Sequence, residues 1–438
     1  MLDMKWLREH AEEVQAVAGQ KGIAVSIDDL LRRDEERRRL KRETDALREK
    51  RNRLSHEIGQ LMALQGQAAL SRREAPTDSD EAHRLRKEMI AVNARLAELA
   101  EELRAAELGV AELCERVPNV VSPDTPVGRS DQDNVERKRV GEPRLFEFEA
   151  RDHIELGELH GLIDVPRGVK AAGSRHYYLK GAGVLLHRAV QQLALELLIG
   201  KGFTPLEVPL MAKEAAMAAT AYFPQGKEQA YGVEGEGRYL VGTSEVPLVM
   251  YYAGEVVDLD VPIKLAAASM CFRSEVGSAG RDVRGLYRVH QFAKVEQVVL
   301  CRADPELSET LLQEITANAE ELLQKLELPY RQVAVCTGDM SQKTYKQYDI
   351  ETWMPSRAAY GETHSSSNLH DFQARRANIR YRDEKGTLRF CHTLNNTAVA
   401  SPRILIPLLE NHQREDGSIH IPEALRPYMN GMSELRAE

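Results

Sequence analysis

The segment from Phe272 to Gln297, FRSEVGSAGRDVRGLYRVHQFAKVEQ, concentrates charged side chains between hydrophobic stretches. A guanidinium group can hold two phosphate oxygens in a fork, so arginines at fixed positions suit an anionic substrate. The charged residues of this segment that raise the question of a function are Arg273, Glu275, Arg281, Arg284 and Glu296. A surface loop could carry the same charges without a function. The rest of the sequence must therefore show whether this segment belongs to a functional site.

Two common nucleotide-binding patterns are missing from the sequence. The pattern GxxxxGK[ST] does not occur, and KGAGVLL at residues 180–186 is not a GxGxxG that follows a strand. The metal-binding patterns HExxH and EF-hand are also missing. If the chain handles a nucleotide, it must therefore do so by another geometry than a P-loop or a Rossmann site.

Composition narrows the class of protein. The 438 residues leave room for two or three domains, and a net charge of −9 gives no overall positive field that would attract nucleic acid. The five cysteines form no CxxC pair, which is typical of reduced thiols in a cytosolic protein. The N-terminus lacks the features of a signal or transit peptide, and we find no apolar run long enough to span a bilayer. We therefore expect a cytoplasmic protein with no membrane partner.

The N-terminal quarter carries a hydrophobic repeat. Across residues 85–113 the apolar positions recur at steps of four and three, which is a heptad seam. Residues 40–61 repeat this spacing with polar Thr44 and Arg51 on the seam, and a polar, breaker-rich link at 65–81 separates the two. We expect an antiparallel helical hairpin that forms a long exposed arm, rather than a bundle packed on the body of the protein.

The two expected arm helices differ in charge. The first, LLRRDEERRRLKRETDALREKRNRL, is rich in arginine, whereas the second, LAELAEELRAAELGVAELCE, leans acidic. Pairing between the helices would explain this asymmetry as well as a function would. The functional interpretation is a basic stripe that lies along a nucleic-acid backbone and releases its counterions.

The remainder of the chain has a mixed pattern. The stretch RVPNVVSPDTPVGRSDQDNV is a linker by composition, so we predict domains at 1–115 and 136–438 around a linker at 116–135. Helical VLLHRAVQQLALELLIGKGF and DPELSETLLQEITANAEELLQKL interrupt segments rich in β-formers, without a regular βαβ order. The β-prone segments are TPLEVPLM, RYLVGTSEVPLVMYYAG, PIKLAAASMCFRSE, YRVHQFAKVEQVVLC and LPYRQVAVCTGD. This order predicts an α+β domain on an antiparallel sheet.

The opening segment also supports a family resemblance. FRSE, a polar turn and the returning RVHQFAKVE resemble motif 2 of the class II aminoacyl-tRNA synthetases, and their residues are similar to those of the seryl-tRNA synthetases. The likeness covers essentially the whole chain in order. Besides the N-terminal arm, it is carried by GEPRLFEFEARDHIELGE, YYLKGAGVLL, GFTPLEVPLM, TSEVPL, TGDMSQKTYKQYDIETWMP, SSSNLHDFQARRANIRYR and ASPRILIPLLENHQREDGSIHIPEALRPYM.

The resemblance implies a reaction and partners. Serine and ATP would give seryl-adenylate and pyrophosphate, and serine would then pass to the terminal ribose of tRNA(Ser), with tRNA(Sec) as an optional second acceptor. ATP and Mg²⁺ would be required. A homodimer is implied, with Pro209 in the segment that builds its interface.

The resemblance also assigns roles residue by residue. Arg273 would grip the α-phosphate, Glu275 on the same strand face would orient ATP at its adenine end, and Arg403 would hold the γ-phosphate; these three are the predicted catalytic residues. The residues expected to contact ATP are Arg273, Ser274, Glu275, Val289, Glu362, Thr363, His364, Ser365 and Arg403, of which Glu362 and Ser365 would bind Mg²⁺. The residues expected around serine are Thr243, Ser244, Glu245, Arg273, Glu296 (at the end of the returning strand), Asn395 and Thr397. The residues expected to contact tRNA are Arg38, Lys41, Arg42 and Arg48 on the arm, with Arg51 the weakest candidate, and Arg281 and Arg284 in GSAGRDVRG.

Several positions depart from the usual family pattern. Ser244 stands where alanine is usual, Asn396-Thr397-Ala398 where Gly-Ser-Gly is usual, Pro402 where glycine is usual, and His364 where serine is usual. The phosphate and metal ligands are kept, so the departures concern the amino-acid pocket. Thr397 would keep the hydroxyl that pairs with the substrate hydroxyl, and such a pairing rejects alanine because alanine leaves it unmade.

Two rival functions remain open from the sequence. One is a paralogue with an altered pocket that supplies aminoacyl-tRNA to a biosynthetic pathway. The other is a non-catalytic protein that binds tRNA or another partner, which the retention of Arg273, Glu275, Glu362 and Arg403 disfavours. A ligase for carrier proteins fits less well, because those forms lack an arm.

Overall fold

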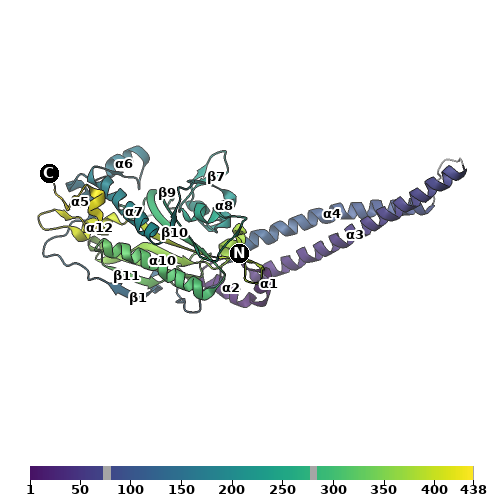
Figure 1. Cartoon of the computed structure of the whole chain (residues 1–438), viewed down its shortest axis with the longest axis horizontal. Coiled ribbons are helices and arrows are strands. Elements are labelled where there is room, and N and C mark those ends of the chain that lie inside the picture. Colours follow the sequence, from purple (N-terminus) through teal and green to yellow (C-terminus); the bar gives the residue numbers. More distant parts are fainter. Residues whose placement is uncertain (73–79, 277–283, 438) are drawn as a thin grey trace. The chain divides into compact units, whose positions relative to one another are not determined.

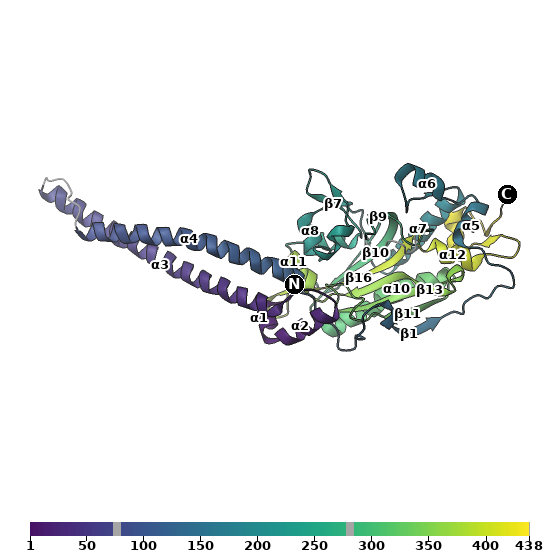
Figure 2. The same ribbon diagram turned by 180° about the vertical axis from the view of Figure 1, so that it is seen from behind.

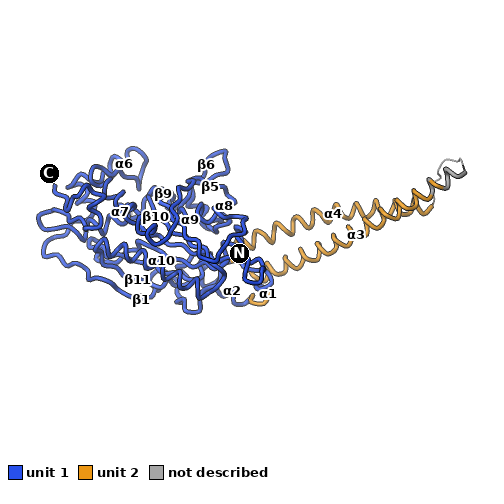
Figure 3. The backbone as a smooth tube through the Cα atoms, in the orientation of Figure 1, with its two compact units in different colours: residues 1–7, 12–23, 118–438 blue, residues 8–11, 24–117 orange. Residues whose placement is uncertain are grey.

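The computed structural model describes residues 1–72, 80–276 and 284–437, which form two compact units (Figure 3). Unit 1 comprises residues 1–7, 12–23 and 118–438, and unit 2 comprises residues 8–11 and 24–117. The domain boundaries expected at 115 and 135 stay predictions.

Unit 2 is built on two long helices, α3 (Ile27–Arg72) and α4 (Asp80–Arg116), which run side by side in opposite directions (Figure 1). The helical hairpin is therefore confirmed, although α3 continues through the first part of the expected link. The heptad positions form the seam between the helices. Its members are buried Leu54, Leu85 and Val92, with Leu47, Ile58, Leu61, Met89 and Leu96 packed against them.

The two polar seam positions of α3 behave differently. Thr44 is buried, and its hydroxyl donates to the carbonyl oxygen of Leu40 at 2.8 Å, which satisfies the side chain within its own helix. Arg51 is exposed and donates to Oδ1 of Asn52 at 3.0 Å, so the expectation that it lies on the seam is wrong.

Ion pairs cross between the arm helices. Lys50 of α3 contacts Glu88 of α4 at 2.6 Å, and Arg95 of α4 contacts Glu43 of α3 at 3.2 Å. Part of the charge asymmetry between the helices is thus used in pairing. Because these side chains are more than one third exposed and solvent screens their charges, each pair contributes little to the stability of the hairpin.

Unit 1 is organised around an eight-stranded sheet with the order β1-β11-β12-β13-β16-β10-β9-β4. All neighbouring strands are antiparallel except β4 and β9, which are parallel, so the expected α+β class is confirmed. The strands are β1 (Val135–Val140), β4 (Thr204–Pro205), β9 (Ile263–Phe272), β10 (Gln291–Cys301), β11 (Tyr330–Ala334), β12 (Lys346–Met354), β13 (Ala359–Asn368) and β16 (His392–Ser401).

Helices and small strand pairs surround this sheet (Figures 1 and 2). The remaining helices are α1 (Met4–Glu9), α2 (Ala11–Gln20), α5 (His153–Leu159), α6 (Val165–Ala172), α7 (Ala182–Gly200), α8 (Glu214–Ala219), α9 (Glu245–Met250), α10 (Pro305–Lys325), α11 (Phe372–Ala377) and α12 (Leu405–His412). The short strands are β2 (Ile163–Asp164), β3 (Tyr178–Leu179), β5 (Met211–Lys213), β6 (Gly232–Val233), β7 (Arg238–Leu240), β8 (Val256–Val257), β14 (Arg380–Arg382), β15 (Leu388–Phe390), β17 (Ile419–His420) and β18 (Glu434–Leu435).

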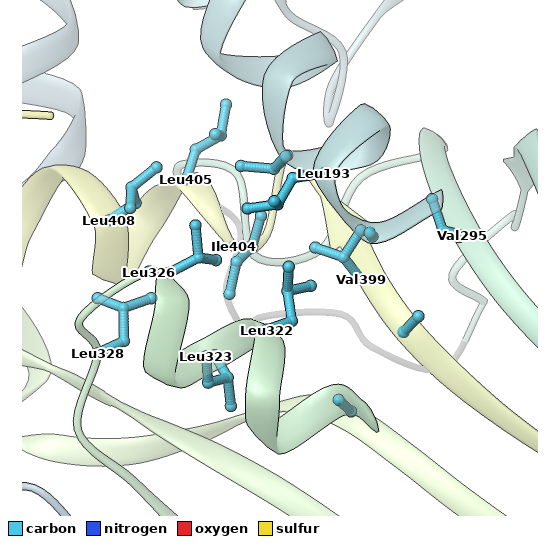
Figure 4. Packing of buried hydrophobic residues seen from close by; sticks show 14 of the residues in the cluster. Leu193, Val295, Leu322, Leu323, Leu326, Leu328, Val399, Ile404, Leu405 and Leu408 are labelled. Carbon is cyan, nitrogen blue, oxygen red and sulfur yellow. The ribbon is translucent and has the colours of Figure 1, made fainter. Parts of the chain in front are cut away.

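The main core lies between the sheet and α7, α10 and α12. Leu193 of α7, Leu322 of α10 and Val399 of β16 meet there, and Figure 4 shows these side chains converging. On β10 the odd-numbered Val295 and Val299 point into this core, because side chains alternate between the two faces of a strand. The even-numbered side chains of β10 consequently face the other side of the sheet.

Three expectations about local structure need correction. The segment TPLEVPLM is not one strand: Thr204–Pro205 forms β4, Met211 begins β5, and residues 206–210 between them, which include Pro209, lie in no strand, because proline cannot donate to a sheet ladder. The segment EVPLVM is the helix α9 and not a strand. The helix α7 is, by length and composition, apolar enough to cross a membrane, although we expected no such run; core helices also meet this criterion, and one face of α7 is packed in the main core.

Candidate active site

A cavity of about 490 Å³ opens in unit 1 on the face of the sheet opposite to α10. It is lined by residues from β10, β12, β13 and β16, and from the loops that follow β9 and β11. Its volume is in the range of small-molecule sites. The predicted ATP and serine contacts that line it are Thr243, Glu245, Arg273, Glu275, Val289, Glu296, Glu362, Thr363, His364, Ser365, Asn395, Thr397 and Arg403.

Two predicted contact residues are not among the residues that line the cavity. Ser244 is fully buried at the start of α9, so its departure from the family pattern changes no lining group. The hydroxyl of Ser274 donates to the carbonyl oxygen of Glu228 at 2.8 Å and is used in holding the chain that follows β9.

Arg273 lies directly after β9, which ends at Phe272. Its Nε donates to the carbonyl oxygen of Gly242 at 3.3 Å, and its guanidinium carbon lies 5.4 Å from the centre of the Phe292 ring. These contacts orient the guanidinium group in the cavity. Phe292 was not among the predicted site residues, although it stands in the quoted segment RVHQFAKVE.

Glu275 does not share a strand face with Arg273, as we had expected, because β9 has already ended. Its φ of 51° is in the left-handed region, which is rare for a residue with a side chain and is found at functional sites. Its carboxylate lies 3.5 Å from Nη1 of Arg288, which also lines the cavity. The turn of the backbone is what brings Glu275 to the cavity wall.

Arg403 lies between β16 and α12. Its Nε donates to the carbonyl oxygen of Tyr287 at 3.1 Å, and its Nη1 donates to that of Glu362 at 3.1 Å. Its guanidinium carbon also lies 4.4 Å from the centre of the Tyr287 ring, and Nη1 is 3.5 Å from the Glu362 carboxylate. A second arginine is thereby fixed in the same cavity as Arg273.

A β-bulge brings Glu362 and Ser365 to one face of β13. Ile350 pairs with His364 and the next residue, Glu351, pairs with Glu362, so Thr363 is an extra residue on β13. Positions three apart on a regular strand point to opposite faces, but one extra residue reverses this. Both side chains line the cavity as a result.

The surroundings of Ser365 are acidic and buried. Its Oγ accepts a hydrogen bond of 3.1 Å from Nε2 of Gln347, which also donates to Asp349 at 2.9 Å. Burial, and next the nearby carboxylate of Glu362, raise the pKa of Asp349 well above its usual value. Within the described part of the chain, no group of three or more His, Cys, Asp or Glu could hold a metal ion.

The other end of the cavity contains a buried network around Glu296. Lys294 places Nζ 2.5 Å from the Glu296 carboxylate and donates to the hydroxyl of Thr243 at 2.7 Å. The hydroxyl of Thr397 lies 3.4 Å from the same carboxylate. Burial raises the pKa of Glu296, and Lys294 opposes this effect. Because β10 continues to Cys301, Glu296 lies in the middle of that strand and not at its end, as we had expected.

A second bulge shapes the strand opposite Glu296. Val295 pairs with Val399 and Glu296 pairs with Thr397, so Ala398 is the extra residue on β16. Ala398 is buried in the main core, whereas Thr397 and Asn395 line the cavity. The departure at 398 is therefore absorbed by the bulge, and the departure at Thr397 is the one that changes the cavity wall.

Glu245 accepts hydrogen bonds from three side chains. Nζ of Lys343 lies 2.5 and 2.6 Å from its two carboxylate oxygens, and the amide groups of Gln373 and Asn395 donate to Oε1 at 2.7 and 2.8 Å. Lys343 and Lys294 were missed at the level of sequence. No pattern distinguished Lys343 within SQKTYK from a solvent-exposed lysine.

His364 is buried in the cavity wall. Its Nδ1 lies 2.8 Å from Oγ1 of Thr363, and burial lowers its pKa to about 3. The imidazole is therefore neutral at pH 7. Pro402, another departure from the family pattern, lines the cavity beside Arg403.

The predicted tRNA contacts are placed less completely. In unit 2, Lys41 and Arg42 are exposed, whereas Arg38 and Arg48 contact Asp34 and Asp45 at 3.2 and 3.6 Å. In unit 1, Arg284 is 73% exposed and contacts Asp152 at 3.4 Å. Arg281 lies outside the described residues.

The antiparallel sheet, the strand pair β9–β10 with Arg273 and the β16–α12 connection with Arg403 together define the core of a class II aminoacyl-tRNA synthetase. Residues 231–412 match the model of the tRNA synthetase class II core domain (G, H, P, S and T), and residues 1–121 match that of the seryl-tRNA synthetase N-terminal domain. The chain is 44% identical to the serine–tRNA ligase of Deinococcus radiodurans and 41% identical to that of Rubrobacter xylanophilus, with 99% and 98% of each chain covered. The ATP complex of seryl-tRNA synthetase from Pyrococcus horikoshii matches over all of both chains at 36% identity, with a TM-score of 0.88. The chain belongs to the seryl-tRNA synthetase family.

Proposed function

We propose that this protein activates L-serine with ATP and transfers it to tRNA(Ser). The serine carboxylate attacks the α-phosphorus of ATP, the bond to the β-phosphate oxygen breaks, and pyrophosphate leaves. A hydroxyl of the terminal ribose of tRNA then attacks the seryl carbonyl and AMP leaves. The observation that carries the proposal is a single cavity that holds Arg273 and Arg403 together with the polar network around Glu296.

The first step needs positive charge more than it needs an acid or a base. Two anions meet, and negative charge increases on the phosphoryl oxygens, so fixed cations lower the barrier. Arg273 would bind the α-phosphate and Arg403 the γ-phosphate, while Glu275 would orient the adenine end. The ring of Phe292, already beside the Arg273 guanidinium group, offers a flat apolar surface for the base.

Mg²⁺ fits the residues on the bulged part of β13. The donors there are a carboxylate from Glu362 and a hydroxyl from Ser365, which are hard oxygen ligands. A site with one carboxylate suits Mg²⁺, which keeps its other positions for phosphate oxygens and water. When bound, the ion would neutralise phosphate charge. The chain itself would orient the two ligands through the bulge and the Gln347 hydrogen bond.

Serine would bind at the opposite end of the cavity. The hydroxyl of Thr397 and the Glu296 carboxylate would pair with the substrate hydroxyl, and Thr243, Glu245 and Asn395 would complete the wall. Because Lys294 and Lys343 already neutralise the two glutamates, the pocket is assembled before serine arrives. A preorganised site of this kind loses less free energy in ordering its side chains.

The partners follow from the family. The exposed Lys41 and Arg42 on the arm and the exposed Arg284 would contact tRNA(Ser), and tRNA(Sec) remains a further acceptor to test. A homodimer is proposed through the segment around Pro209, which is exposed in the single chain. The protein would act in the cytoplasm.

Charging of tRNA with labelled serine tests the function. Purified protein should charge total bacterial tRNA with serine, and the Arg273→Ala variant should not, while both keep the same thermal unfolding temperature. Failure of the folded wild-type protein to charge any tRNA would overturn the proposal and favour a non-catalytic tRNA-binding role. Charging with another amino acid would favour the paralogue.

A further inference from the structure

The loop between β11 and β12 forms one wall of the amino-acid end of the cavity. Its residues Ser341, Gln342 and Lys343 line the cavity, and Lys343 reaches across to both carboxylate oxygens of Glu245. Residues 335–345 lie outside any strand or helix. The backbone groups of this wall therefore need hydrogen-bond partners from other parts of the chain.

One partner is a lysine close to the N-terminus. Lys21 follows α2 directly and is only 7% exposed. Its Nζ lies 2.6 Å from the carbonyl oxygen of Thr344, 3.2 Å from that of Ser341 and 3.5 Å from that of Gln342. One ammonium group thus donates to three backbone carbonyl oxygens, which lie on both sides of Lys343 in the sequence. Burial lowers the pKa of Lys21 to about 7.

A second set of contacts holds the same backbone. The backbone N–H of Asn119 donates to the carbonyl oxygen of Gln342 at 2.8 Å, and its Nδ2 donates to that of Lys343 at 3.0 Å. The ring of Tyr345 stacks on His370, with ring centres 3.7 Å apart. The backbone on either side of Lys343 is therefore fixed by residues that are far away in the sequence.

We propose that Lys21 is a positioning residue for the serine pocket, which it serves by fixing the Ser341–Thr344 backbone so that Lys343 meets Glu245. This inference rests on the proposed function of the cavity. Lys21 is not among the residues that line the cavity, so it would act through Lys343. Small displacements of a positioned group have large effects on binding and rate. Loss of the Lys21 hydrogen bonds should therefore affect the serine end of the cavity and leave the ATP end unchanged.

The variant Lys21→Met tests the inference, because methionine keeps most of the apolar stem and removes the donors. Serine-dependent exchange of pyrophosphate into ATP should show a serine KM about tenfold higher, with the KM for ATP within about twofold of wild type. Asn119→Ala, which removes the Nδ2 contact, should act in the same direction. Lys138→Met is the matched control: it removes an ion pair of 2.7 Å with Glu320 away from the cavity and should change neither KM.

Combination with Lys343→Met separates positioning from general stability. If Lys21 acts through Lys343, adding Lys21→Met to Lys343→Met should raise the serine KM by less than about twofold. An equal increase in both backgrounds, or an unchanged serine KM in Lys21→Met, would overturn the inference. Hydrogen exchange of the backbone amides of residues 342–345 gives a result that does not depend on activity. We expect faster exchange in Lys21→Met. Unchanged protection would contradict the inference that Lys21 fixes this backbone. If the wild-type protein showed no serine-dependent exchange of pyrophosphate, the proposed function would be overturned. The hydrogen exchange of the amides would still show whether Lys21 fixes the Ser341–Thr344 backbone.

Discussion

Nζ of Lys294 lies 2.5 Å from the Glu296 carboxylate, two positions along the same strand, and both side chains are more than 90% buried. The spacing of two places them on one face of β10, opposite to the face that packs in the main core. A hydrogen bond from Lys294 to Thr243 connects the pair to the next wall of the cavity. The strand thus builds the core with one face and, with the other, the part of the cavity that we propose binds serine.

Removal of one member of this pair should cost stability. Lys294→Met leaves the Glu296 carboxylate buried without its cation, so the free energy of unfolding should fall by about 3 kcal/mol. The double variant with Glu296→Gln should recover most of this loss. Urea unfolding followed by circular dichroism measures both. Lys227→Met, which removes an exposed pair with Glu214, should cost much less stability than Lys294→Met, and an equal cost in both lysine variants would contradict this expectation.

The hydroxyl of Thr397 should govern discrimination between serine and alanine. Thr397→Val keeps the shape of the side chain and removes the hydroxyl that we propose pairs with the substrate hydroxyl. We expect kcat/KM for serine to fall by about 10–100-fold with little change for alanine, because alanine never made the contact. Pyrophosphate exchange with each amino acid measures the ratio. If the ratio of kcat/KM for serine to that for alanine equalled the wild-type ratio, Thr397 would not distinguish serine by its hydroxyl.

Arg403 should act on ATP and not on serine. Arg403→Gln removes the guanidinium donors expected at the γ-phosphate, so the KM for ATP should rise about tenfold or more while the KM for serine stays nearly constant. Arg357→Gln is a matched control, because its guanidinium carbon lies at the same 4.4 Å from the centre of the Tyr287 ring and it is not among the residues that line the cavity. Similar kinetics for the two variants would contradict the assignment.

The exposed basic side chains of the arm should affect tRNA and leave activation unchanged. Lys41→Glu and Arg42→Glu should each raise the KM for tRNA(Ser) and lessen its dependence on salt, because each would remove a proposed contact with a tRNA phosphate. Pyrophosphate exchange should be unaffected. The exposed Arg104 on α4 provides a control. An equal effect of Arg104→Glu would contradict the proposal that the basic side chains of α3 are the ones that contact tRNA.

Buried histidines should make the fold sensitive to acid. Burial lowers the pKa of His370 to about 3 and that of His392 to about 4, whereas both have values near 6.5 in the unfolded chain. As the pH falls below 6.5, the unfolded chain takes up protons that the folded chain does not. The stability present at pH 7 is therefore lost progressively until the pH reaches the folded pKa values, by about 2 kcal/mol per histidine at pH 5. Urea unfolding at pH 7 and pH 5 should show a smaller loss for His392→Gln than for wild type; an equal loss would contradict this.

Much of the fold could be predicted from local patterns. The heptad spacing identified the arm, and the strands β9, β10 and β11 and the helices α7 and α10 follow hydrophobic runs with clear ends. The valines of EVPLVM favour a strand, whereas the segment is a helix whose Leu248 and Val249 pack in a buried cluster.

The proposed catalytic residues came from the resemblance, and their geometry could not come from the sequence. The residue types do not predict the bulges at Thr363 and Ala398, yet these bulges determine which side chains line the cavity. Lys343 was missed for a similar reason. Its role depends on the path of an irregular loop, which is set by contacts with residues as distant in sequence as Lys21.

Exchange of pyrophosphate into ATP, measured with serine, threonine, alanine, glycine and cysteine side by side, shows directly whether this protein activates serine. We expect the strongest exchange with serine, and rates at least about a hundredfold lower with alanine and glycine, which lack a hydroxyl. Exchange driven best by another amino acid, or by none of the five in folded protein, would contradict this expectation.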